Sequence, residues 1–257
     1  MDMRRRTRHP KERRINRRFI PNLVTVLNMF WGFVAIGLMI HERYVAAGWL
    51  ILLAGFMDAI DGKLARLIGI PSKFGTEFDS LADTVSFCLA PSILVYKLYV
   101  TGLPPLAALV ISFIPLMMGT IRLAKFNLIE TPQPYYVGLT TPMNALLLFG
   151  FMMFNMRTLG TPGDPRLALV LVLVLGFLMN SPVRFAKLPL LSFHQGRQNT
   201  RRLIFFASLL IFLAVGQSLV IFPLLFIYTT WSILDWLLHP NRLDELMDVP
   251  TFHREEP

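Results

Sequence analysis

The sequence has 257 residues, of which 54% are hydrophobic and 16% are charged, and its mean hydropathy is +0.54. Soluble domains normally carry about 25% charged residues, so this composition argues against a soluble protein and favours one that lies in a membrane. The single cysteine, Cys88, excludes a disulfide framework within the chain. The net charge of +9 is concentrated at the start, because the first 18 residues hold nine Lys or Arg and two acidic residues.

Long apolar runs predict an all-α, polytopic membrane protein with about eight transmembrane helices, since each crossing takes roughly 20 residues. After the basic segment 1–19, the first apolar stretch, 20–40, is too long for a cleaved signal and indicates a retained span. The other spans are expected at 44–69, 76–100, 103–125, 141–156, 166–182, 203–217 and 219–238.

The distribution of basic residues predicts an orientation. With eight spans, the loops on one side hold most of the 25 Lys and Arg, whereas the other side receives only Arg43, Lys97, Arg157 and Arg166. Both termini are therefore expected in the cytoplasm, with the chain in a bacterial-type cytoplasmic (inner) membrane. The basic N-terminal segment predicts contact with anionic lipid rather than nucleic acid, because no aromatic residues are interleaved with its charges.

Acidic residues lie inside two of the expected spans, Asp58 and Asp61 in the second and Asp79 and Asp83 in the third. An unpaired Asp in the middle of a transmembrane helix costs about 2.5–3.5 kcal/mol on insertion scales, so such residues normally face water, a partner charge or an ion. The spacings of three and four place each pair on one helix face. An antiparallel hairpin that turns at 69–72 brings Asp61 level with Asp83, so the four carboxylates are expected to converge.

Four carboxylates this close need cation charge among them. None of the five histidines is near them in the sequence, so the expected ions are hard, Mg²⁺ or Mn²⁺ rather than Zn²⁺. Four carboxylates can hold two such ions, and Arg66 follows Asp61 closely enough to reach a phosphate oxygen. A buried ion network and the proton path of a transporter are alternative interpretations of the spacing alone.

The same residues form a family motif. It resembles the signature of the CDP-alcohol phosphotransferases at every fixed position, in the form Asp58-x2-Asp61-Gly62-x2-Ala65-Arg66-x8-Gly75-x3-Asp79-x3-Asp83. The resemblance implies a membrane-embedded enzyme, usually a homodimer, whose site opens to the cytoplasm. We expect the family core, with about six transmembrane helices, at 20–182, followed by a loop and the last two helices at 183–240 and a cytoplasmic tail at 241–257.

The resemblance also implies roles for the motif residues. Asp58, Asp61 and Asp79 are expected to bind metal, and Asp83 to be the general base that also touches the second metal. The small residues and the arginine are expected to bind the cytidine diphosphate part of the donor; they are Gly62, Ala65, Arg66 and Gly75. In the implied reaction the alcohol oxygen attacks the lipid-side phosphorus and CMP leaves.

Within this family the chain is most similar to the membrane-integral phosphatidylserine synthases. The similarity lies in Pro21-Asn22-Leu23-Val24-Thr25, in Phe78-Asp79-Ser80-Leu81-Ala82-Asp83 and in Arg122-Leu123-Ala124-Lys125-Phe126-Asn127. It implies CDP-diacylglycerol and L-serine as substrates and phosphatidylserine and CMP as products. Where that subgroup usually has Gly-Leu-Pro-x-Pro, this chain has Gly138-Leu139-Thr140-Thr141-Pro142, in a segment that can shape the acceptor pocket.

Five further polar residues are candidates for substrate contacts. Asn22, Thr25 and Asn28 recur every three residues in the first span and would bind the donor's cytosine or ribose, or else join helices through polar contacts. Arg122 and Lys125, at the end of the fourth span, would hold the acceptor's carboxylate or a lipid phosphate, or else anchor the helix.

Two rival functions predict different patterns. A phosphorylated acceptor such as glycerol 3-phosphate or inositol phosphate calls for an additional basic cluster over the site, and choline is another possible acceptor within the family. A cation or proton transporter predicts acidic residues spread through the depth of the membrane. The four aspartates instead fall in the same half of two adjacent spans, which favours a one-sided enzyme site.

Overall fold

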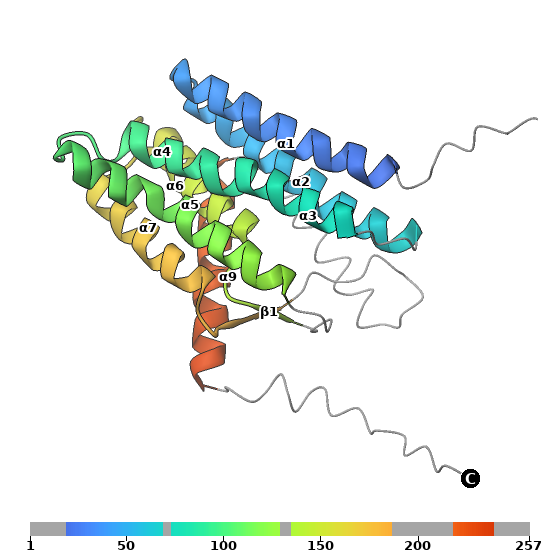
Figure 1. Ribbon diagram of the computed structural model, residues 1–257. Helices are drawn as coiled ribbons and strands as arrows, with labels where there is room; N and C mark the ends of the chain where they lie inside the picture. Colours follow the sequence, from blue (N-terminus) through green and yellow to red (C-terminus); the bar gives the residue numbers. More distant parts are fainter. Residues whose placement is uncertain (1–18, 69–72, 129–134, 187–217, 239–257) are drawn as a thin grey trace, which may run out of the picture.

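The computed structural model describes residues 19–68, 73–128, 135–186 and 218–238, and these residues are mostly helical (Figure 1). The helices are α1 (Phe19–Ile40), α2 (Tyr44–Ile68), α3 (Lys73–Asp83), the π-helical turn η1 (Thr84–Leu89), α4 (Ala90–Leu98), α5 (Pro105–Asn127), α6 (Thr141–Thr158), α7 (Pro165–Met179) and α9 (Ser218–Leu238). Two short strands, β1 (Tyr135–Val137) and β2 (Arg184–Ala186), pair antiparallel with Tyr136 opposite Phe185.

Four of these helices are long and apolar enough to cross a membrane, over Asn22–Ile40, Lys73–Leu98, Pro105–Asn127 and Ser218–Leu238. Large apolar side chains such as Phe33, Leu106 and Trp231 are exposed on them, as expected of surfaces that face lipid. The expectation of a mainly helical membrane protein is therefore confirmed, although the short pair β1–β2 departs from a purely α-helical fold. The number of eight spans stays a prediction, because the expected span at 203–217 lies outside the described residues.

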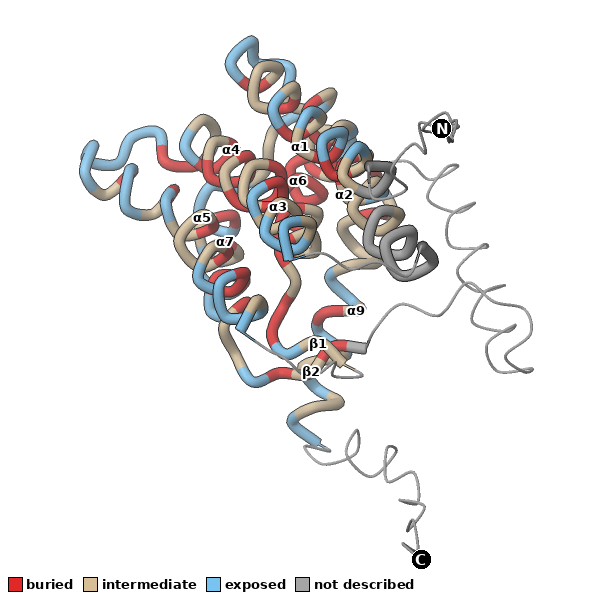
Figure 2. The backbone as a smooth tube through the Cα atoms, turned by 45° about the vertical axis from the view of Figure 1, so that its right-hand side comes forward, coloured by how far each residue is buried: buried red, intermediate tan, exposed pale blue. Residues whose placement is uncertain are grey.

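The helices form a bundle with α6 inside it. α6 packs against α2, α7 and α9, while α1 packs against both α2 and α3. Figure 2 shows buried backbone where α1, α4 and α6 come together. The core there is built from apolar side chains with little or no exposure, among them Ala35, Leu94, Leu148 and Met152. This core fixes the relative positions of the helices that carry the acidic residues.

The third expected span is one continuous helical rod, but its middle is wound as the π turn η1. Pro91 has no N–H to donate to the carbonyl four residues before it, and the Ala90 N–H bonds to the Val85 oxygen, five residues back. The turn begins directly after Asp83 and divides the span into a polar half, α3, and an apolar half, α4. Such turns are frequent at functional sites.

The connection into α6 is held in place by its backbone. Gly138 has a φ of +73°, and a side chain there would overlap the Met179 carbonyl oxygen, so the position requires glycine. Its N–H bonds to the Val183 oxygen at 2.8 Å, and the Leu139 N–H bonds to the Leu178 oxygen at 3.0 Å. Thr140 then caps α6 by accepting from the Met143 N–H.

Candidate metal and substrate site

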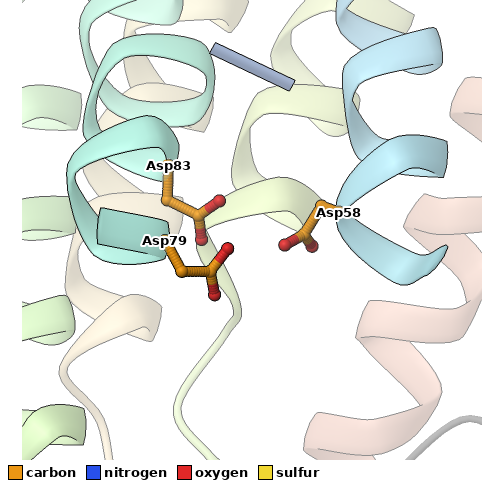
Figure 3. A group of neighbouring side chains, drawn as sticks. All are labelled: Asp58, Asp79 and Asp83. Carbon is orange, nitrogen blue, oxygen red and sulfur yellow. The ribbon is translucent and has the colours of Figure 1, made fainter. Parts of the chain in front are cut away.

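Three of the four intramembrane aspartates converge. Asp58 comes from α2, and Asp79 and Asp83 come from one face of α3, and one carboxylate oxygen from each lies within 4.8 Å of the other two. Figure 3 shows the Asp79 and Asp83 side chains directed from α3 toward Asp58. The three groups therefore can hold a metal ion between the two helices.

The other half of the motif lies on the last two turns of α2. The helix continues through these positions to Ile68, but the side chains of Asp61, Gly62, Ala65 and Arg66 lie outside the described residues. The expected pairing of Asp61 with Asp83 therefore stays a prediction. Gly75, the remaining small residue of the motif, is half-buried in the first turn of α3.

Asp83 is the most enclosed of the three carboxylates, with 7% of its surface exposed. The Asn28 Nδ2 donates to its Oδ1 at 3.3 Å, and the Thr141 Oγ1 donates to its Oδ2, also at 3.3 Å. These donors belong to α1 and α6, so three helices meet at this carboxylate. A carboxylate held in this way by two donors stays an acceptor-only group, the kind that binds a cation or takes a proton.

Asp79 lies one turn before Asp83 and has a different environment. Its Oδ1 is buried and, within the part of the chain that the structure describes, has no hydrogen-bond partner. A buried carboxylate oxygen without a partner is costly, and so is its closeness to two other carboxylates. A hard divalent cation relieves both costs and prefers oxygen ligands. The residues present therefore fit Mg²⁺ or Mn²⁺.

Arg122 of α5 adds a buried positive charge to the site. Only 8% of the residue is exposed, and its Nε has no hydrogen-bond partner among the described residues. Of the carboxylates that act on it electrostatically, Asp83 has the larger effect and Asp58 a smaller one. Lys125 differs, because its side chain is exposed and donates to the Asn180 Oδ1 at 3.2 Å. Arg122 is thus turned into the bundle, whereas Lys125 links α5 to the end of α7.

The three polar residues of α1 differ in depth. Asn28 is fully buried at Asp83, Thr25 is buried one turn earlier, and Asn22 is half-buried near the start of the helix. The Asn28 Oδ1 has no partner among the described residues, so this amide has one acceptor left for a ligand. The row leads from the acidic cluster toward the end of the bundle that carries the motif.

Two contacts at the site are not apparent from the sequence. The Asn127 Nδ2 donates to the Ser80 Oγ at 3.0 Å and to the Glu77 Oε2 at 3.3 Å, which fastens the end of α5 to α3. Thr141 bonds to Asp83, as described above. Asn127 and Thr141 both lie in segments that were compared with the phosphatidylserine synthase subgroup, but the sequence does not predict which residues they contact.

Comparisons with known proteins agree with this site. The sequence model of the family described as CDP-alcohol phosphatidyltransferase matches residues 18–181. A Helicobacter pylori (strain ATCC 700392 / 26695) protein named CDP-diacylglycerol--serine O-phosphatidyltransferase is 32% identical over 223 residues, 84% of this chain and 90% of that protein.

Proteins with the same name in other organisms are also similar. The one from Methanocaldococcus jannaschii is 34% identical over 171 residues, which are 66% of this chain and 75% of that protein. The one from Bacillus subtilis (strain 168) is 34% identical over 133 residues, 51% of this chain and 73% of that protein. The match includes all of α1 to α7 and hence Asp58, Asp79 and Asp83. The chain belongs to the CDP-alcohol phosphatidyltransferase family.

Proposed function

We propose that this protein transfers a phosphatidyl group from CDP-diacylglycerol to L-serine, giving phosphatidylserine and CMP. The observation that carries the proposal is the convergence of Asp58, Asp79 and Asp83 in a chain that matches serine O-phosphatidyltransferases over most of its length. The similar proteins bear one name in bacteria and an archaeon, which favours serine over glycerol 3-phosphate, inositol phosphate or choline.

In the proposed reaction Asp83 is the general base. The serine hydroxyl oxygen forms a bond to the lipid-side phosphorus, and the bond from that phosphorus to the bridging oxygen breaks, so CMP leaves with the bond's electron pair. The hydroxyl proton passes to Asp83, whose two oxygens already accept from Asn28 and Thr141 in the ionised form. The enclosed position of Asp83 limits competition from water for that proton.

Asp58, Asp61 and Asp79 are the proposed metal ligands, with Asp83 touching a second ion. Mg²⁺ or Mn²⁺ bound there supplies positive charge that neutralises the phosphate oxygens during transfer. The small residues and the arginine of the motif, Gly62, Ala65, Arg66 and Gly75, are proposed to bind the cytidine diphosphate.

The polar residues of α1 are proposed to bind the donor beside this motif. Asn22, Thr25 and Asn28 form a row that ends at the acidic cluster, and the Asn28 Oδ1, which has no partner in the described part of the chain, is an acceptor for a substrate N–H or hydroxyl. Arg122 is proposed to bind the serine carboxylate, because it is a buried cation that interacts electrostatically with Asp83 and whose Nε has no partner among the described residues. Lys125 is proposed to contact the acceptor or a lipid phosphate from its exposed position.

The arrangement in the membrane is part of the proposal. Eight spans, a core at 20–182 and both termini in the cytoplasm place the site at the cytoplasmic side of the inner membrane, where serine is available. Charge asymmetry supports this orientation. The segments 183–240 and 241–257 would then be the loop with the last two helices and the tail, and a homodimer is the expected assembly.

The test is CMP release by the purified protein with CDP-diacylglycerol, Mn²⁺ or Mg²⁺ and a panel of alcohols: serine, glycerol 3-phosphate, inositol phosphate and choline. We expect release that requires serine and metal, formation of phosphatidylserine, and loss of both in Asp83→Asn. In Arg122→Lys the KM for serine should rise while the KM for CDP-diacylglycerol changes little. Release with another alcohol instead of serine overturns the acceptor and keeps the transfer chemistry.

A further inference from the structure

We propose that Thr141 is a positioning residue for Asp83, whose hydroxyl fixes the carboxylate in the orientation that the transfer reaction needs. The inference rests on the proposed function, in which Asp83 takes the proton of the acceptor alcohol. Thr141 belongs to the segment 138–142, in which this chain departs from the pattern Gly-Leu-Pro-x-Pro. The departure itself is Thr140 in place of the first proline, and Thr141, the residue that contacts the candidate base, occupies the variable position next to it.

The argument begins with the freedom of the Asp83 side chain. The torsion that rotates an aspartate carboxylate has a broad, roughly two-fold energy profile, so a carboxylate with one hydrogen bond can still swing. Asn28 donates to Oδ1 from α1, and Thr141 donates to Oδ2 from α6, each at 3.3 Å. Two donors on different oxygens, brought by different helices, restrict the rotation that either donor alone would permit.

The backbone around Thr141 makes it a rigid donor. Thr141 is the first residue of α6 and is fully buried, with Pro142 next to it in the first turn. The preceding residues are fastened to the end of α7 by the Gly138 and Leu139 N–H groups, and Thr140 caps the helix. A catalytic group is held to within a fraction of an ångström only when its supporting groups are themselves fixed. Thr141 meets this requirement.

The Asn28 side of the carboxylate is supported in the same manner. The Ser86 Oγ, in the π turn, donates to the Asn28 backbone oxygen at 3.0 Å. A side chain at Gly32 would overlap Ser86, so α1 and η1 touch directly at this point. The turn that follows Asp83 is thus joined to the helix that carries Asn28, and Thr141 completes the support from the opposite side.

The two ends of the Thr141 side chain serve different contacts, and this makes the inference testable. Its hydroxyl faces Asp83, while its methyl group lies against α5 near Gly119. Valine has the same shape and keeps the methyl packing without the hydroxyl, whereas serine keeps the hydroxyl without the methyl. A role in packing and a role in positioning therefore predict opposite orders of activity for Thr141→Val and Thr141→Ser.

The experiment measures kcat and both KM values for CMP release with CDP-diacylglycerol, serine and saturating Mn²⁺. For Thr141→Val we expect kcat to fall about 10- to 100-fold, the scale of a lost hydrogen bond to a charged group, with both KM values within about threefold. Thr141→Ser should keep kcat within about threefold. The matched control is Thr229→Val, since Thr229 is a buried threonine whose hydroxyl donates to the Leu225 oxygen of its own helix, α9.

Four results overturn the inference. Thr141→Val with the kcat of the unaltered protein shows that the hydroxyl is dispensable. Equal losses of kcat in Thr141→Val and Thr141→Ser show that packing matters instead of the hydroxyl. The same conclusion follows if Thr229→Val also loses kcat together with Tm. If the valine variant does not fold, Thr141→Ala, which also lacks a donor, replaces it, and full kcat there overturns the inference too. The unaltered protein is assayed first. If it forms no phosphatidylserine, the proposed function itself fails, and this result is distinct from a failure of the inference about Thr141.

Discussion

The two halves of the third span, α3 and α4, differ in what holds them in the bundle. α3 carries Asp79 and Asp83, and side-chain hydrogen bonds join it to Asn28, Thr141 and Asn127 of three other helices. α4 follows the π turn, and Ala90, Leu94 and Val95 lie fully buried in the apolar core. The same continuous helix thus has a polar half, which is joined to its neighbours by directional hydrogen bonds, and an apolar half, which is held by packing in the core.

This difference indicates how a membrane protein can place several acidic residues in one span. The apolar half supplies the packing that keeps the rod in place, so the polar half need not bury its own surface in a core. Asp83 instead accepts hydrogen bonds from α1 and α6, and a cation held by the three carboxylates would offset their remaining charge. Changes in α3 are therefore expected to reduce activity more than stability, and changes in α4 to do the reverse.

The largest expected effect is the loss of activity in Asp79→Asn. CMP release should fall at least about 10³-fold, the scale seen when a member of a catalytic unit is removed. The Tm of the metal-free protein should not fall, because the change removes a charge from a group whose Oδ1 is buried without a partner. Activity and thermal unfolding of the same preparation measure the two quantities.

The matched control in α3 is Glu77→Gln. Glu77 is exposed, and a glutamine oxygen can still accept from Asn127, so activity should stay within about threefold. If Asp79→Asn keeps its activity, Asp79 is not a metal ligand and the polar half has another role. An equal loss in both variants would indicate that any reduction of negative charge on α3 is harmful.

In α4 the expected effect is on stability. Leu94→Ala removes a fully buried side chain from the core and should lower the free energy of unfolding by about 2–5 kcal/mol, while kcat stays within about threefold. Tm and kcat of the purified protein test this expectation. Tyr96→Leu is the control on the same helix, because Tyr96 is 49% exposed. A large loss of kcat at unchanged Tm in Leu94→Ala would remove the distinction between the two halves.

Most of the helical architecture follows from the sequence, because a crossing of about 20 apolar residues is a one-dimensional signal. The spacing of Asp79 and Asp83 likewise predicts a shared helix face, and the structure brings both to Asp58. The relative height of α2 and α3 is harder to predict. The predicted pairing of the aspartates considered only α2 and α3 as a hairpin. It did not include α1, which packs against both helices and helps to set their relative positions.

The partners of the acidic residues could not be predicted from local pattern. Thr141 and Asp83 are 58 residues apart, and their contact depends on the glycine turn at 138 and on the end of α7. The departure from the subgroup pattern is at Thr140, and it does not indicate that the neighbouring Thr141 contacts Asp83. The π turn was not predicted for a similar reason. Pro91 shows that one helical hydrogen bond is missing, but the sequence does not show whether the helix kinks or forms a π turn. That choice depends on the neighbouring helix, here on the contact of Ser86 with Gly32.

A change at the junction of the two halves should affect both properties. In Gly32→Ala the new methyl group would overlap the Ser86 side chain and lie 2.7 Å from its Cα, so α1 and η1 must move apart. Overpacking of this kind costs about 1–3 kcal/mol, and it also displaces Asn28 from Asp83. We expect lower Tm together with a fall of kcat of about tenfold.

Gly37→Ala is the control for this prediction, because nothing lies within 4 Å of a side chain at Gly37 on the same helix. It should match the unaltered protein in kcat and Tm. A Gly32→Ala variant that loses stability but keeps kcat would mean that the π turn moves without moving Asp83, and the two halves of the span would then be mechanically independent.

The smallest expected effect is that of Asn127→Ala. It removes two hydrogen bonds to α3, each with a net contribution of about 0.5–1.5 kcal/mol, and should reduce kcat about 3- to 10-fold with a small change of Tm. Leu128→Ala, at an exposed position next to it, is the control. Combining Asn127→Ala with Ser80→Ala tests the contact itself: if the bond between them is what positions α3, the double variant loses less than the product of the single losses. If the losses of kcat in the two single variants simply multiply, the contact between Asn127 and Ser80 does not position α3. This end of α3 would then be held by something other than its polar partners, and the difference between α3 and α4 would not hold.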